Sequence, residues 1–160
     1  MKFAAIDIGS NAIRLLFVNV FETKNGPVFH KDELVRVPVR LGEDSFLNGR
    51  ISDPKVEEVI KTMSIMKMLI DIHKANAYKA CATSAMRDAE NGEEIIELVR
   101  QRTGIEIEIL PGEAEASIIM QYPLKQAGID PSGSYLYIDV GGGSADFALI
   151  EGGQMVKKKI

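Results

Sequence analysis

Short apolar runs separated by turn signals open the chain and predict β-strands. Residues 2–8, KFAAIDI, and 13–21, IRLLFVNVF, flank the tight turn GSNA. The Asn-Gly step within TKNGP, residues 23–27, predicts a hairpin into a third strand over 28–40, whose positions alternate towards its end. The first forty residues therefore predict an antiparallel meander of three strands.

The apolar spacing changes from a strand pattern to a helical one after residue 51. The motif SDP at 52–54 is a helix start, with proline at or near the first helical position. The apolar residues that follow share one predicted helix face: Val56, Val59, Ile60, Met63, Met66 and Ile70. We assign the cluster of Met63, Met66 and Met68 to the core, rather than to a soft binding surface.

Strands and helices alternate through the next part of the chain. Residues 77–83, AYKACAT, predict a fourth strand, and 92–104 predict a helix that Gly104 closes. Residues 105–110, IEIEIL, alternate and predict a fifth strand, after which 112–128 begin as a helix. The predicted order is βββαβαβα, which is an α/β fold.

The end of the chain repeats the beginning. IDIG at 6–9 matches IDVG at 138–141, which is 132 positions later, and small residues and an apolar strand follow each motif. MVKKKI at 155–160 predicts the start of a third strand in this second unit. Because 132 residues is too long for a solenoid repeat, we expect two lobes of one design that face each other. The predicted boundaries are 1–128 for the first lobe and 129–160 for the beginning of the second, incomplete lobe.

Composition and charge narrow the class of protein. The net charge of −4 gives no reason to expect binding to nucleic acid or to an anionic membrane. A single cysteine, Cys81, cannot form a disulfide within the chain, and no apolar run is long enough to span a bilayer. We expect a cytoplasmic protein without a nucleic-acid or membrane partner.

The two repeated loops suggest binding of phosphate groups. Glycine allows backbone N–H groups to approach an anion, and Ser10, Asn11 and Ser144 add side-chain donors. Asp7 and Asp139 end the strands before the loops; they would repel bare phosphate but could hold Mg²⁺, which then binds phosphate. The alternative is a pair of ordinary hairpin turns with incidental acids.

Two further segments contain candidate residues. CATSAMRDAEN, residues 81–91, follows the fourth strand and contains Thr83, Ser84, Arg87 and Asn91. The planar guanidinium of Arg87 suits phosphate oxygens, although a capping loop with a surface arginine is the alternative. LPGEAEASI, residues 110–118, opens a helix with Glu113 and Glu115, and acids at a helix start are often only partners of the helix dipole.

Five segments together resemble one known family. They are AIDIGSNAIRLL, VRLGEDSFLNGRIS, ATSAMRDAEN, ILPGEAEASI and IDVGGGSADF, in that order. The family is that of the exopolyphosphatase/guanosine pentaphosphate phosphohydrolase (Ppx/GppA) phosphatases, in the actin-like ATPase superfamily. The resemblance implies an actin-like (ribonuclease H-like) fold. It also implies Mg²⁺-dependent hydrolysis of the terminal phosphoanhydride of polyphosphate or guanosine pentaphosphate.

The resemblance also assigns roles to individual positions. Glu115 matches the catalytic base of the family, and Arg87 its phosphate-binding arginine. The positions matching the two phosphate loops are Ser10, Asn11, Arg14, Gly141, Gly142, Gly143 and Ser144. The acids assigned to the metal are Asp7, Asp139 and Asp146, the last standing where the family usually has glutamate.

The chain departs from the family pattern at several positions, which leaves the substrate open. Ala12 replaces a usual serine or threonine, Ser117 a frequent arginine, and Ala145-Asp146 a usual Thr-Glu. Two other functions therefore stay open: an ATP-dependent phosphotransferase of the same superfamily, and a non-catalytic binder of alarmones or polyphosphate. We expect these residues to be the N-terminal part of a longer, homodimeric protein. The ribbon at 134–160 should be poorly ordered, pair with another chain, or pack on the first lobe.

Overall fold

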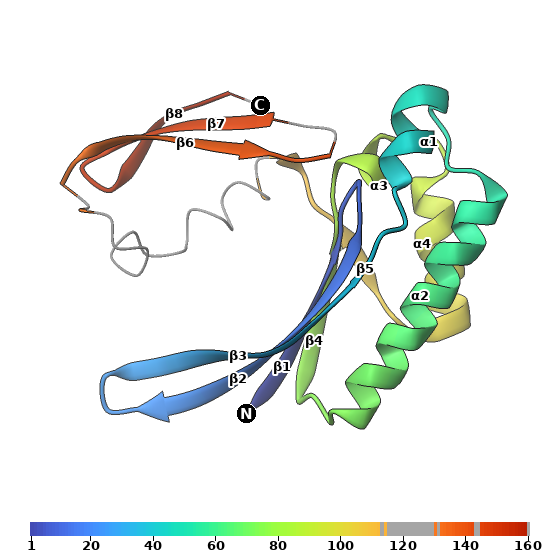
Figure 1. The fold of residues 1–160 in the computed structure, drawn as a ribbon, viewed down its shortest axis with the longest axis horizontal. Coiled ribbons are helices and arrows are strands. Elements are labelled where there is room, and N and C mark those ends of the chain that lie inside the picture. The colour runs from blue at the N-terminus through green and yellow to red at the C-terminus, as the bar shows by residue number, and fades with distance from the viewer. Residues whose placement is uncertain (113, 115–129, 131, 143–144, 160) are drawn as a thin grey trace. The chain divides into compact units, whose positions relative to one another are not determined.

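The computed structural model describes residues 1–112, 114, 130, 132–142 and 145–159. They belong to two compact units, Met1–Ile109 and Leu110–Ile160 (Figure 1). The predicted lobe boundary between residues 128 and 129 lies outside the described residues, as does nearly all of the helix predicted at 112–128. In the part of the chain that is described, no helix is both long and apolar enough to cross a membrane.

The first unit is built on a five-stranded sheet with the order β3-β2-β1-β4-β5. Its strands are β1 (Lys2–Ile8), β2 (Ile13–Thr23), β3 (Gly26–Val37), β4 (Ala77–Ala82) and β5 (Ile107–Ile109). The β1–β2 and β2–β3 pairs are antiparallel, whereas β1–β4 and β4–β5 are parallel. The predicted meander and the five strands are confirmed, with β3 ending three residues earlier than expected.

Four helices connect the strands of this unit. They are α1 (Leu41–Asn48), α2 (Asp53–Ile72), α3 (Ser84–Asp88) and α4 (Gly92–Thr103). The start of α2 and the end of α4 lie where the sequence predicts them. Gly104 adopts a φ of +72° and donates its N–H to the Arg100 carbonyl, which is the expected glycine cap. The short helices α1 and α3 were not predicted.

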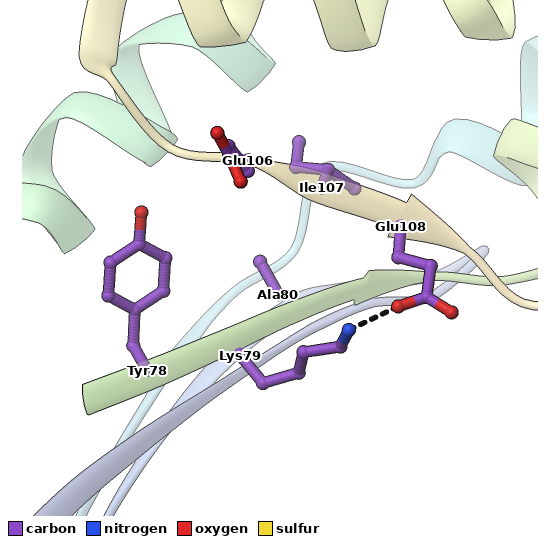
Figure 2. A pocket seen from close by; sticks show the side chains of 6 residues that line it. All are labelled: Tyr78, Lys79, Ala80, Glu106, Ile107 and Glu108. Carbon is purple, nitrogen blue, oxygen red and sulfur yellow. Dashed lines mark hydrogen bonds and ion pairs between the residues drawn. The ribbon is translucent and has the colours of Figure 1, made fainter.

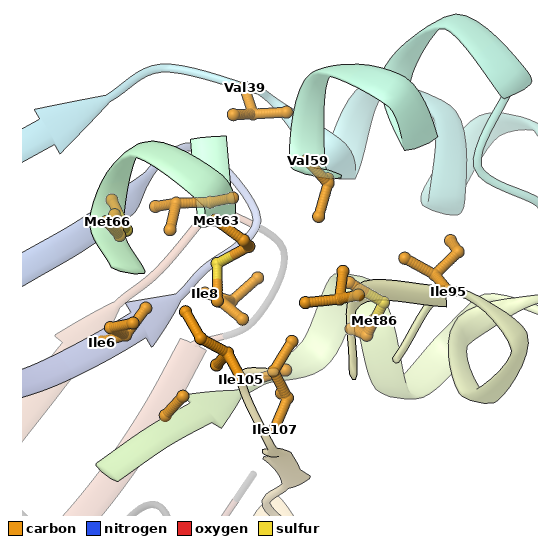
Figure 3. Close-up of a cluster of buried hydrophobic side chains, with 14 of the residues drawn as sticks. Ile6, Ile8, Val39, Val59, Met63, Met66, Met86, Ile95, Ile105 and Ile107 are labelled. Carbon is orange, nitrogen blue, oxygen red and sulfur yellow. The ribbon is translucent and has the colours of Figure 1, made fainter. Parts of the chain in front are cut away.

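The core lies between one face of the sheet and the helices α2 and α4 (Figures 1 and 3). Every residue of the predicted α2 face is buried there, and Met63 and Met66 are fully enclosed. Ile6 and Ile8 of β1 contribute the matching sheet surface. Met68 is 63% exposed, so its assignment to the core is wrong: it is two positions beyond Met66 and therefore points away from the sheet.

The second unit contains a three-stranded antiparallel sheet: β6 (Ser134–Val140), β7 (Ala145–Glu151) and β8 (Gln154–Lys159). The third strand predicted at the chain end is therefore confirmed, and the β7–β8 pair contains a register irregularity between Leu149 and Ile150.

The repeat is visible in the strand register. Asp7 lies opposite Arg14 in the β1–β2 pair, and Asp139 lies opposite Asp146 in the β6–β7 pair. The β1 face that packs under the helices corresponds to an uncovered face of β6. Ile138 and Val140 are 52% and 74% exposed, whereas Ile6 and Ile8, their counterparts, are 2% and 1% exposed.

Candidate functional site

Parallel pairing of β1 with β4 brings two loops together at the carboxyl ends of these strands. Ile8 lies beside Ala82, and the Thr83 N–H donates to the Ile8 carbonyl at 3.1 Å. The first loop, residues 9–12, therefore starts next to α3. Ser10 Oγ and Ser84 Oγ form a buried hydrogen bond of 2.9 Å between the loop and the helix.

The segment leading into α1 holds the same loop from another side. The Arg40 N–H donates to the Asn11 carbonyl at 3.0 Å, and the Gly42 N–H donates to the Ser10 carbonyl at 2.8 Å. A Cβ at Gly42 would lie 2.8 Å from the Phe46 ring and 3.2 Å from Ser10 Cβ, so a larger residue here would require the Phe46 side chain to move and Ser10 to shift slightly. The first loop is thus fixed by backbone bonds before any ligand arrives.

Arg40 is a charged residue that the sequence patterns did not single out. It adopts a left-handed conformation with a φ of 56° at the N-cap of α1. Such a conformation costs a non-glycine residue about 1–2 kcal/mol. Its guanidinium is exposed, 3.5 Å from Glu43. Arg40 lies just after a strand, in a segment without periodic apolar spacing, so no local pattern indicated that it belongs to the site. The only sequence signal for it was the resemblance of the VRLGE segment to the family.

Asp7 and Arg14, two predicted site residues, lie side by side. Arg14 Nη1 donates to Asp7 Oδ2 at 3.1 Å, and both side chains are about half exposed. A Cβ placed on Gly9 would lie 4.0 Å from the other oxygen, Oδ1, which is an ordinary van der Waals distance. Arg14 is therefore a partner of the metal candidate Asp7, in addition to its predicted role towards phosphate.

The segment 81–91 contributes to the site differently from the prediction. Arg87 belongs to the last turn of α3 rather than to a loop, and its Nε lies 3.4 Å from Asp88 Oδ1. Asn91 is only 3% exposed, and its amide accepts from the Ile51 N–H and donates to the Ile51 carbonyl. Both functional groups of Asn91 are occupied, so Asn91 is a structural residue and its grouping with the phosphate candidates is wrong.

The remaining predicted residues are described in part. Gly141 and Gly142 follow β6 and are exposed, whereas Gly143 and Ser144 lie outside the described residues. Glu113 and Glu115 also lie outside them, so the assignment of Glu115 as the base stays a prediction. Among the described residues, no three histidine, cysteine or acidic side chains gather into a metal-binding group.

A polar hollow of about 270 Å³ lies beside β4 and β5, and no residue of the first loop lines it (Figure 2). It is lined by Tyr78, Lys79, Ala80, Glu106, Ile107 and Glu108. The Lys79 ammonium is paired with the Glu108 carboxylate, which raises the pKa of Lys79. With its lysine already neutralised by this pair, the hollow is poorly suited to a phosphate chain.

The buried Ser10–Ser84 bond gives a direct test of how the first loop is held. Ser10→Ala and Ser84→Ala should each lower the free energy of unfolding by about 1–2 kcal/mol, because each leaves a buried hydroxyl without its partner. The double variant should lose about 1 kcal/mol less than the sum of the two, as measured by urea denaturation. Additive losses would show that the two hydroxyls do not interact.

Comparison with known proteins identifies the family. Residues 26–159 match the Ppx/GppA phosphatase family. Exopolyphosphatase 1 of Mycobacterium tuberculosis is 30% identical over 146 residues, which cover 91% of this chain and 41% of that protein. A bifunctional 3-dehydroquinate synthase/phosphatase of Fusobacterium nucleatum is 33% identical over 163 residues, covering 98% of this chain and 24% of that protein.

Solved structures agree with this match. The Ppx/GppA family member of Aquifex aeolicus superposes with a TM-score of 0.79 at 31% identity, over 99% of this chain and 50% of that one. An exopolyphosphatase from Cytophaga hutchinsonii gives a TM-score of 0.84 at 23% identity, over 99% of this chain and 49% of that one, which supports the actin-like ATPase fold. The chain spans half or less of the length of these relatives. From its matched sequence and its fold, this chain belongs to the Ppx/GppA phosphatase family.

Proposed function

We propose that the complete protein is a phosphoanhydride hydrolase. It releases the terminal phosphate of inorganic polyphosphate, or converts guanosine pentaphosphate to the tetraphosphate. Membership of the family and the similarity to a protein named exopolyphosphatase support this proposal. The structural observation that carries it is the first loop, which bonds to both α1 and α3 at the carboxyl ends of β1 and β4.

Loop rigidity suggests how phosphate is bound. Phosphoryl transfer depends mainly on positioning and on neutralising charge, so a fixed loop is an advantage. The Ser10 hydroxyl is buried against Ser84, and we assign it to positioning the loop. The side chain of Asn11 is exposed, and Asn11 and Arg87 are the residues that we assign to contact with phosphate oxygens.

The acids of the two repeats suit a hard divalent cation such as Mg²⁺. Asp7 lies near the end of β1, two residues before the first loop begins. Asp139 is paired with Asp146 in the register of β6 and β7, so the second repeat supplies two acids at one step of the sheet. Mg²⁺ is usually bound by one or two carboxylates, with water and substrate phosphates as the other ligands. When bound, the cation neutralises part of the charge on the phosphate oxygens.

Glu115 is the residue that we assign to the chemical step. Its carboxylate accepts a proton from a water molecule, whose oxygen forms a new bond to the terminal phosphorus. The bond from phosphorus to the bridging oxygen breaks, and that oxygen leaves on the shortened chain. Arg87 holds the terminal phosphate in line for this displacement.

Phosphate release by the complete protein tests the proposal. Long-chain polyphosphate, guanosine pentaphosphate and ATP should be compared, each with Mg²⁺ and with excess chelator. We expect release from at least one of the first two, little from ATP, and loss of release with chelator. Transfer from ATP to an acceptor would establish a phosphotransferase instead, and binding of polyphosphate or guanosine pentaphosphate without release would establish a non-catalytic binder.

A further inference from the structure

The edge strand β3 is long and exposed. It contains 12 residues and pairs with β2 on one side, while no described strand pairs with its other side. Residues 27–34 are all exposed, including the large apolar side chains of Phe29 and Leu34 at 68% and 61%. The β2–β3 hairpin also extends beyond the end of β1, whose pairing stops at Lys2 opposite Asn19 (Figure 1). Long, exposed strand edges with large apolar side chains favour pairing with another strand.

The sequence of β3 is complementary to itself when read in the opposite direction. Around a centre between Lys31 and Asp32, the segment VFHKDELV places like apolar residues and opposite charges at matching positions. The four matched pairs are Val28 with Val35, Phe29 with Leu34, His30 with Glu33, and Lys31 with Asp32. Two copies paired antiparallel would make each of these contacts twice.

We propose that β3 pairs antiparallel with β3 of a second copy of this chain, with the two-fold axis between Lys31 and Asp32. A two-fold axis requires a self-complementary surface, which this strand has. The Phe29–Leu34 contacts bury apolar surface on both sides of the axis. The resulting sheet extends from the first unit of one copy into the first unit of the other.

The charges select this register over its neighbours. A shift of the centre onto Lys31 sets Lys31 against itself and Phe29 against Glu33, and a shift onto Asp32 sets two aspartates together. Like charges directly opposite are unfavourable, so only the proposed register satisfies both the charged and the apolar positions.

Features within one copy limit the strength of the pairing. Glu33 pairs with Phe17 and Lys31 with Val18, so Asp32 is the extra residue of a bulge, and hydrogen bonding is expected on either side of it. Asp32 also contacts Lys2 at 2.6 Å, and Glu33 contacts His73 at 3.3 Å. An interface of one strand pair is small, below about 1,200 Å². We therefore expect a weak dimer, whose population rises between about 1 and 100 µM.

Variants that reverse the charge at Lys31 or Asp32 test this pairing in the 160-residue chain. K31D presents two acids beside the axis in each copy, and D32K presents two lysines, so each variant repels itself. Both should dimerise about tenfold or more weakly than the wild type in sedimentation equilibrium. Mixed in equal amounts, they should recover wild-type association, because each acid then faces a lysine. K24D makes the same charge change in the hairpin turn, outside the paired segment, and should associate like the wild type.

Each outcome of this experiment supports or overturns the proposed β3–β3 pairing. A monomeric wild type at 100 µM overturns the proposal, and so do variants that dimerise normally, since another surface would then be responsible. Two weakened variants that fail to associate when mixed also overturn it. Recovery in the mixture supports it and shows at the same time that both variants are folded.

Discussion

Replacement of Glu115 by glutamine in the complete protein is expected to abolish most phosphate release, while binding of the phosphate chain stays nearly intact. Glutamine has nearly the size of glutamate and keeps one acceptor oxygen, but its amide cannot take up the proton of the attacking water. Loss of a positioned general base usually lowers the rate by about 10²–10⁴. Turnover by phosphate release and binding by calorimetry should be measured on the same preparation.

Glu113 offers a matched control, because it lies two positions earlier in the same segment. Glu113→Gln makes the same chemical change, and we expect it to retain much more activity. Near wild-type turnover in Glu115→Gln would overturn the assignment of Glu115 as the base. Equal losses of activity in both variants would show that turnover depends on the negative charge of the segment rather than on one general base.

Replacement of Gly92 by alanine should have the largest effect on stability in the first unit. A Cβ at this position would lie 2.0 Å from the Met86 carbonyl oxygen and 3.1 Å from the Met86 carbonyl carbon. Both atoms belong to the backbone, so α3 and the start of α4 would have to move apart. Overpacking typically costs 1–3 kcal/mol, and with backbone on both sides we expect a loss of about 3 kcal/mol or more in urea denaturation.

Gly104, at the other end of α4, separates this clash from the general effects of removing glycine. Its φ of +72° is left-handed, but a Cβ there would have no neighbour within 4 Å. Gly104→Ala should therefore cost only about 1 kcal/mol, from backbone strain alone. If the two variants lost the same stability, the contact with Met86 would not be the reason that position 92 is a glycine.

The sequence predicted the elements that have a strong pattern of their own. The strand 2–8, the start of α2 after Ser52 and the glycine cap at Gly104 were all located correctly. Each depends on local chemistry: an apolar run, a proline in the first helical turn, and a left-handed residue after the last turn. The buried face of α2 also followed from spacing alone, because helical period fixes which residues share a face.

The short helices α1 and α3 could not be predicted in the same way. With eight and five residues they are too short for a helical period to show, and they are marginal as isolated helices. Tertiary bonds define them instead: Ser45 Oγ donates to the Ala85 carbonyl at 2.7 Å, joining one helix to the other. The hydroxyl pair of Ser10 and Ser84 is likewise a contact between residues 74 apart, which no local pattern contains.

The part of the candidate site that belongs to the internal repeat was predictable from the sequence. Asp7 and Asp139 were expected at equivalent positions, and the strand registers agree. The structural role of Asn91 was not predictable. The local sequence around this asparagine is the same whether its amide faces solvent or bonds to the backbone of Ile51. Burial decides between these two, and burial depends on the whole fold.

The common register of the two strand pairs is best explained by a gene duplication. Separately evolved hairpins have no reason to place their acids at the same step of the ladder, whereas two copies of one ancestral segment inherit it. The copies have since diverged at the facing position, where one has Arg14 and the other Asp146. The first pair therefore combines residues of opposite charge, whereas the second combines two acids, so the two descendants of one segment differ in charge at the same step of the ladder.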